Sequence, residues 1–147
     1  MNVVYVAFDG PTHWDWIQKR HPFLRVTDTC GFMAVDGETA EPIAAAIFDT
    51  FMHNTAQVSM IIDNMAAVKH GFIEEMAQFL FDGYGKDYAY CKVSANNTKS
   101  LRITKRAGFK EVGRLSGAGL NGCDHILFEM HKDDCIFYTP VQKIEVA

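Results

Sequence analysis

The polar residues best placed for chemistry lie in one predicted helix within VSANNTKSLRITKRAGFKEVGR, residues 93–114. At 3.6 residues per turn, four small or medium residues fall on one side and three cations on the other. The inner side holds Ser100, Ile103, Thr104 and Ala107, and the outer side holds Lys99, Arg102 and Arg106. An ordinary core helix buries larger side chains, so this narrow hydroxylated stripe would leave room for a ligand to approach. Periodicity alone, however, favours a surface helix with a thin apolar stripe and a solvated basic face.

Both ends of this helix carry residues that suit helix termini. Asn96 or Asn97 is expected at the N-cap, where a side-chain oxygen accepts a hydrogen bond from a first-turn N–H group. Gly108 suits the left-handed position that ends many helices, and Phe109 then begins a new strand. The helix is therefore expected between residues 97 and 108.

Asp63, the last residue of a strand predicted at Gln57–Asp63, and His53, shortly before that strand, have side chains of the kind that can act as general bases. A carboxylate or an imidazole at such a place can remove a proton from an attacking nucleophile. The alternative for each is an ordinary surface or turn residue. The remaining histidines have no metal-ligand spacing, so no metal site is predicted.

The rest of the chain reads as strands with two further helices. Alternation and turn residues predict strands at Val3–Phe8, Cys30–Val35, Pro42–Met52, Gln57–Asp63, Asp87–Val93, Glu111–Leu115 and Ile126–Met130, with a turn at Asp36-Gly37. Helices are predicted at Thr12–Arg20, capped by Thr12 after a Gly10-Pro11 breaker, and from Phe72 through Leu80, stopping before Gly83. Strand, helix and strand over 57–93 suggest a parallel pair with a right-handed crossover. The expected fold is α/β, with a mixed sheet covered on both faces, in a single domain spanning residues 1–147.

A literal G-x-G-x-x-G occurs at Gly117, Gly119 and Gly122, the pattern of a dinucleotide-binding turn. That chemistry needs a strand before the glycines and a helix after them, because the helix N-terminus receives the pyrophosphate. The following residues, CDHILFEM, alternate like a strand, and Asn121-Gly122 is a strong hairpin signal. The segment is therefore predicted to be a hairpin loop.

Composition excludes several classes of protein. The chain has 147 residues, of which 48% are hydrophobic, and its formal net charge of −4 disfavours a general nucleic-acid binder. No apolar run approaches the ~20 residues of a membrane span, and no basic segment precedes the apolar start, so a cytoplasmic protein without membrane association is expected. The scattered cysteines (Cys30, Cys91, Cys123 and Cys135) are expected to be reduced thiols, although their even number leaves a disulfide open.

Asn97-x-x-Ser100 and Lys105-Arg106-Ala107-Gly108-Phe109 together resemble the N-x-x-(A/S)…K-x-G-F segment of the GNAT N-acetyltransferases. The resemblance extends from about Cys30 to Met130 and is closest to small acyltransferase-like proteins of phages and bacteria. In it, residues 30–44 are similar to strand 2, turn and strand 3 of the family, 57–63 to strand 4, and 71–82 to helix 3. The resemblance implies a GNAT-like fold of minimal size.

The resemblance also implies that the protein binds acetyl-CoA or another acyl-CoA. The pantetheine amides would pair with the exposed edge of a strand, between residues 57–63 and 87–93, and the pyrophosphate would meet N–H groups at a helix N-terminus. The cofactor-binding residues it implies are Ile61, Ile62, Asp63, Lys69, His70, Gly71, Phe72, Asn97, Ser100 and Thr104.

Two departures from the family pattern bear on activity. Only Gly71 remains of the phosphate loop Q/R-x-x-G-x-G/A, because Val68 and Ile73 stand at two of its positions. Lys69 and His70 can add positive charge there. Thr104 stands where many members have a tyrosine that protonates the leaving thiolate, and a hydroxyl of this type is a poor proton donor.

The function that follows is an acyl-CoA-dependent N-acyltransferase, with acetyl transfer to a small-molecule or peptide amine by direct attack. Its catalytic candidates are Asp63, His53 and Thr104. The alternative is a catalytically inactive GNAT-fold accessory or binding protein, either phage-associated or cellular. A phage-encoded protein would work in the host cytoplasm, and a homodimer is left open.

Overall fold

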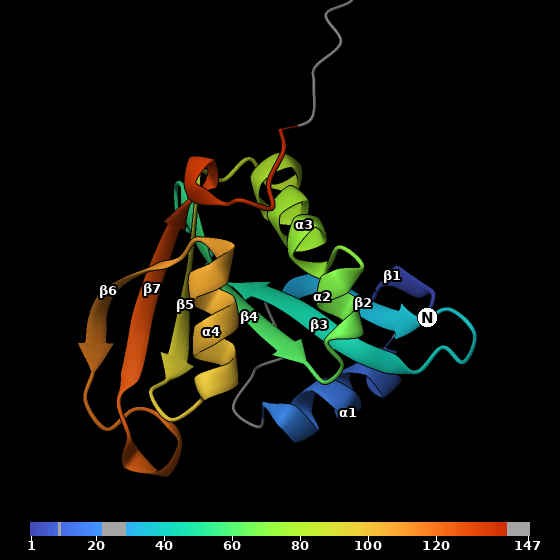
Figure 1. Cartoon of the computed structure of the whole chain (residues 1–147), viewed down its shortest axis with the longest axis horizontal. Coiled ribbons are helices and arrows are strands. Elements are labelled where there is room, and N and C mark those ends of the chain that lie inside the picture. The colour runs from blue at the N-terminus through green and yellow to red at the C-terminus, as the bar shows by residue number, and fades with distance from the viewer. Residues whose placement is uncertain (9, 22–28, 141–147) are drawn as a thin grey trace, which may run out of the picture. The chain divides into compact units, whose positions relative to one another are not determined.

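The computed structural model describes residues 1–8, 10–21 and 29–140 of the chain. The chain divides into two compact units, Met1–Phe72 and Ile73–Ala147 (Figure 1). Both combine helices with antiparallel strands, which confirms the predicted α/β class.

The first unit is a four-stranded antiparallel sheet with a helix packed on it. Its strands, in spatial order, are β1 (Val3–Ala7), β2 (Cys30–Asp36), β3 (Pro42–Asp49) and β4 (Thr55–Ile62), and its helices are α1 (Gly10–Arg20) and the short α2 (Ala66–Lys69). Since neighbouring residues of a strand point to opposite faces, the pairing register decides which side chains meet each layer.

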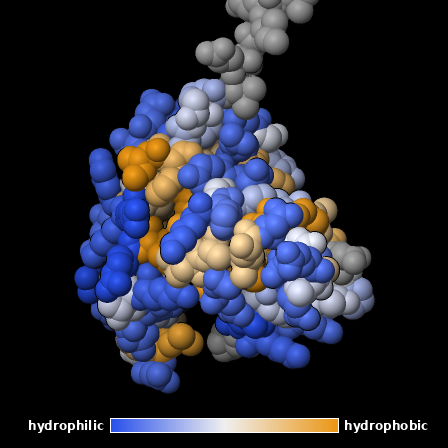
Figure 2. Space-filling model, turned by 45° about the vertical axis from the view of Figure 1, so that its right-hand side comes forward, coloured by the Kyte–Doolittle hydropathy of each residue, from blue (hydrophilic) through white to orange (hydrophobic). Residues whose placement is uncertain are grey.

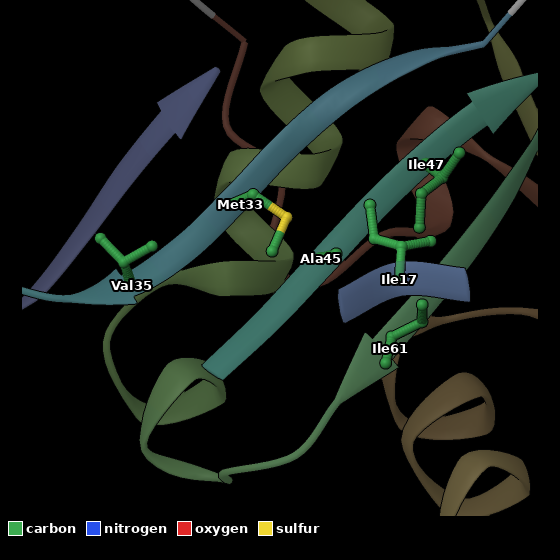
Figure 3. Close-up of a cluster of buried hydrophobic side chains, with 6 residues drawn as sticks. All are labelled: Ile17, Met33, Val35, Ala45, Ile47 and Ile61. Carbon is green, nitrogen blue, oxygen red and sulfur yellow. The ribbon is translucent and has the colours of Figure 1, made fainter. Parts of the chain in front are cut away.

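Both faces of this sheet are covered, which explains why the middle of β3 is buried without interruption. On one face, Met33, Val35, Ala45, Ile47 and Ile61 form a buried cluster with Ile17 of α1 (Figure 3). On the opposite face, Phe32 of β2 packs against Phe72, with ring centroids 5.7 Å apart. The apolar alternation in β2 and β3 therefore fixes α1 on one side and the start of the next helix on the other.

In the second unit, β7 (His125–His131) lies between β5 (Tyr88–Ser94) and β6 (Lys110–Leu115) and pairs antiparallel with both. The helical segments are α3 (Phe72–Ala77, which begins at the last residue of the first unit), a π-helix at Gln78–Gly83, α4 (Thr98–Ala107), and short 3-10 turns at Leu120–Gly122 and Lys132–Asp134. In Figure 1, α4 runs alongside β5 and β7. Its buried residues and those of the two strands form the core of this unit.

Several predicted boundaries are wrong. Helix α1 begins at Gly10, so Thr12 lies inside the helix rather than at its cap, because Pro11 fits a first helical turn. Strand β3 ends at Asp49, not Met52, since Thr50 has a positive φ of 48° that interrupts the extended chain. The helix predicted from Phe72 does begin there, but it changes from α to π geometry after Ala77 and includes Gly83, before which it was expected to stop.

The hairpin reading of the G-x-G-x-x-G segment is confirmed. It connects β6 to β7, which pair antiparallel, and contains a single 3-10 turn rather than the start of a long helix. Within it, the Gly119 N–H group donates to the Cys123 carbonyl at 2.7 Å. All four cysteines are free, as expected for reduced thiols.

The surface in Figure 2 is largely hydrophilic, with hydrophobic residues confined to smaller areas. The most exposed large apolar side chains are single residues in different elements, such as Val112, Leu120 and Ile136. Within the described ranges, no helix is long and apolar enough to span a bilayer.

Candidate functional site

Strand β4 and the residue after it supply three of the predicted cofactor residues. Ile61 is 6% exposed and lies in the cluster under α1, so its side chain is committed to the core. Only the backbone of Ile61 can then pair with a ligand along the strand. Ile62, on the other face of the strand by the pairing register, is half-buried.

Asp63 leaves β4 in a fixed position. Its N–H group donates to the Ile43 carbonyl at 2.9 Å. Its carboxylate accepts hydrogen bonds from Arg20, with Nε 3.0 Å from Oδ1 and Nη2 2.6 Å from Oδ2. The Arg20 guanidinium also lies over the Trp16 ring, 3.9 Å from its centroid, and donates to the Trp16 carbonyl. Because both carboxylate oxygens of Asp63 are already hydrogen-bonded, Asp63 is better suited to fixing the end of β4 than to acting as a general base.

His53 does not lie with Asp63. It is an exposed residue of the loop that precedes β4, whereas Asp63 follows the last residue of the same strand. A strand rises about 3.3 Å per residue, so the eight residues of β4 hold the two side chains about 20–25 Å apart. The structure therefore does not bring the two candidate bases to one place.

The four predicted phosphate residues are consecutive at the junction of α2 and α3. Lys69 ends α2 and is exposed, as is His70. Gly71 has a φ of 92°, a conformation that residues with a side chain rarely adopt. Phe72, the first residue of α3, is fully buried. The junction thus combines two exposed basic side chains with a backbone turn that requires glycine.

Two side chains that the sequence did not single out hold this junction and the strand end. Arg20 bonds Asp63, and the Tyr5 hydroxyl donates to the His70 carbonyl at 2.6 Å. Tyr5 lies in an unremarkable predicted strand, and Arg20 is one of several basic residues at the end of a predicted helix. A partner more than forty positions away leaves no local signal in the sequence.

In the second unit, α4 has the predicted ends. The Asn97 Oδ1 atom accepts a hydrogen bond from the Ser100 N–H group at 3.1 Å, which makes Asn97 the N-cap. Gly108 takes the left-handed conformation at the C-terminus, with a φ of 118°. The predicted faces are also confirmed, because Thr104 and Ala107 are buried, Ser100 and Ile103 are half-buried, and the three cations are exposed.

Thr104 is almost completely buried and so leaves little surface for a ligand. The residue is 2% exposed, and its hydroxyl hydrogen-bonds the Cys91 thiol of β5. Burial raises the pKa of Cys91 to about 12, with the Thr104 hydrogen bond acting in the opposite direction, so the thiol remains protonated at neutral pH. The pair joins α4 to β5. Ser100, one turn closer to the N-terminus, keeps part of its surface open.

No group of three or more metal-binding side chains occurs among the described residues. The predicted binding residues that lie together are therefore those of the α2–α3 junction in one unit and those at the Asn97–Ser100 end of α4 in the other.

Comparison with known proteins places this fold in a class. No protein-family model matches the chain, and no curated protein matches its sequence. Solved structures do match, and they show that the chain has the fold of the GNAT N-acetyltransferases, as the sequence predicted.

Two of the similar structures are of enzymes whose names give different acceptors. One is the spermidine/spermine N-acetyltransferase SpeG from Vibrio cholerae, with a TM-score of 0.67 and 14% identity over 89% of this chain and 93% of that one. Another is the ribosomal-protein-S5-alanine acetyltransferase from Vibrio fischeri, with a TM-score of 0.64 and 16% identity over 85% of this chain and 74% of that one.

Proposed function

We propose that this protein is an acyl-CoA-dependent N-acyltransferase that transfers an acetyl group from acetyl-CoA to an amine. The observation that carries the proposal is the fold match over nearly the whole chain to N-acetyltransferases with unlike acceptors. By name both are acetyltransferases, whereas the acceptors differ. The proposal therefore fixes the reaction class and leaves the amine, small molecule or peptide, to be identified.

The α2–α3 junction fits the phosphates of the donor. Gly71, with its positive φ, has no Cβ to obstruct an approaching phosphate, and backbone N–H groups at a helix start carry partial positive charge. Lys69 and His70 are exposed on the same short segment. These residues would hold the pyrophosphate. Asn97 and Ser100 remain the predicted contacts of the pantetheine arm.

When bound, acetyl-CoA supplies a thioester whose carbonyl carbon an unprotonated amine attacks. The chain has to align the amine, remove its proton and polarise the carbonyl through a backbone N–H group. Asp63, His53 and Thr104 remain the predicted catalytic residues. Because Arg20 occupies the carboxylate of Asp63 and Thr104 is buried, alignment is expected to contribute more of the rate than these side chains.

Acetyl-CoA binding is the first test. A ligand at 100 times its dissociation constant adds about 2.7 kcal/mol to the free energy of unfolding, which raises the melting temperature of a domain this size by roughly 5–10 °C. Lys69→Gln should weaken binding, because it removes one exposed positive charge from the junction. Lys19→Gln, which removes another exposed charge, from α1, should leave affinity unchanged. Thermal melts with acetyl-CoA and a titration of each variant measure both.

Turnover is then measured with acetyl-CoA and a panel of amines that includes spermidine and a peptide beginning with alanine. Release of free thiol with at least one amine is the expected result. Binding without turnover on any amine would favour the rival, an inactive GNAT-fold accessory protein. No thermal shift at millimolar acetyl-CoA would contradict the proposal itself.

A further inference from the structure

The segment from Asp63 to Gly71 is fastened at its two ends by side chains from distant parts of the first unit. At its start, Arg20 of α1 binds the Asp63 carboxylate through Nε and Nη2. At its end, the Tyr5 hydroxyl of β1 donates to the His70 carbonyl at 2.6 Å. Between them, the Asn64 side chain accepts from the Ala66 N–H group at 2.9 Å and starts α2.

The Tyr5 contact controls the direction of one particular donor. The peptide bond between His70 and Gly71 is planar and trans, so the His70 carbonyl and the Gly71 N–H group point in opposite directions. A hydroxyl that holds the carbonyl oxygen therefore also sets where the Gly71 N–H group points. Without that hold, a glycine at this place has more freedom to rotate than any other residue.

Contacts between aromatic rings keep Tyr5 itself in place. Its ring packs edge-on against Phe32 with centroids 5.8 Å apart, and Phe32 packs in the same way against Phe72 at 5.7 Å. Phe72 is buried and directly follows Gly71. Both neighbours of Gly71 are thus fixed from the β1–β2 side of the sheet, His70 through its carbonyl and Phe72 through its ring.

Arg20 is similarly held before it meets Asp63. Its guanidinium lies over the Trp16 ring and donates to the Trp16 carbonyl one helical turn earlier. A guanidinium that is already held in place loses less conformational entropy when it binds a carboxylate. Its planar pair of N–H donors also matches the two carboxylate oxygens. The end of β4 is thereby attached to α1.

From these contacts we infer that Tyr5 is a positioning residue that aims the Gly71 N–H group of the α2–α3 junction at the pyrophosphate of an acyl-CoA, and that Arg20 supports it by anchoring the start of the same segment. The inference rests on the proposed function, because it assigns the ligand of the junction from it. It explains how a phosphate loop with one glycine keeps a defined shape: the side chains that order it come from β1 and α1.

The test compares Tyr5→Phe with the wild type and with Tyr138→Phe. Both variants lose one hydroxyl and keep the ring, but the Tyr138 hydroxyl bonds the Asp82 carboxylate at 2.7 Å in the second unit. Amide hydrogen exchange of the unliganded proteins is measured at Lys69 and His70, whose N–H groups donate to the carbonyls of Met65 and Ala66. Exchange at these two amides should be several-fold faster in Tyr5→Phe and unchanged in Tyr138→Phe.

Affinity is measured for acetyl-CoA and for S-acetylpantetheine, which lacks the pyrophosphate. Loss of one hydrogen bond that orients a donor should weaken acetyl-CoA binding by roughly three- to tenfold in Tyr5→Phe. S-acetylpantetheine should bind both proteins equally. Arg20→Lys, which keeps the charge and loses the fork, should shift both measurements in the same direction as Tyr5→Phe.

The outcomes separate this inference from the proposed function. A wild type that binds no acetyl-CoA contradicts the proposed function. Unchanged exchange at Lys69 and His70 in both variants overturns the anchoring, whether or not acetyl-CoA binds. Faster exchange with unaltered acetyl-CoA affinity, or an equal loss of S-acetylpantetheine affinity, overturns the link between the anchors and the phosphates.

Discussion

At the scale of single residues, Thr104 shows how burial changes the meaning of a sequence position. From spacing alone, Thr104 and Ser100 are equivalent members of a small inner stripe, and leucine at either position should have the same effect. In the structure, Thr104 is buried against Cys91 and Ser100 is only half-buried. The two positions should therefore respond differently to the same change.

We expect Thr104→Leu to destabilise the protein by about 1–3 kcal/mol, because the added volume enters a filled space. Ser100→Leu should cost less stability and, if Ser100 faces the pantetheine arm, should weaken acetyl-CoA binding more. Urea unfolding and acetyl-CoA titration of both variants give the comparison. Thr104→Val, which keeps the volume, is the control for the hydroxyl. A fall in kcat with unchanged stability in Thr104→Val would show that Thr104 is a catalytic residue after all.

At the scale of elements, the sequence predicts most helices and strands because they repeat apolar residues with a regular period. It also predicts both ends of α4, where Asn97 and Gly108 have local roles that their residue types reveal. What it misses depends on geometry rather than composition. The positive φ of Thr50 and the π-helix after Ala77 have no residue signature of their own, and the partners of Asp63 and His70 come from distant segments.

Gly108 gives an element-scale prediction, because two independent requirements meet there. Its φ is 118°, and a Cβ atom would collide with the Asp134 carbonyl oxygen, a backbone atom that cannot move alone. We expect Gly108→Ala to destabilise the protein by about 2–4 kcal/mol through backbone strain and overpacking together. Gly113→Ala is the matched control, since a Cβ there would meet only the Leu127 side chain, at 3.6 Å. Similar unfolding free energies for the two variants would contradict this account of the end of α4.

At the scale of the whole molecule, the open question is whether the chain unfolds as the single domain that the sequence predicts. Two compact units, Met1–Phe72 and Ile73–Ala147, are distinguished within it. Chains of about 70 residues bury only about 60% of the surface that they expose when unfolded, and their stability is correspondingly marginal. Two units of this size are therefore expected to depend on each other for stability.

We predict one cooperative unfolding transition, and the chain carries its own probes for the test. Both tryptophans, Trp14 and Trp16, lie in the first unit, so their fluorescence reports on that unit, whereas far-ultraviolet circular dichroism reports on both. The two signals should give the same midpoint in urea, and calorimetry should give equal calorimetric and van't Hoff enthalpies of about 100 kcal/mol near 60 °C. Gly108→Ala should move the fluorescence midpoint as far as the dichroism midpoint, although the substitution lies in the second unit. A dichroism midpoint that shifts while the tryptophan signal stays in place would mean that the two units fold independently.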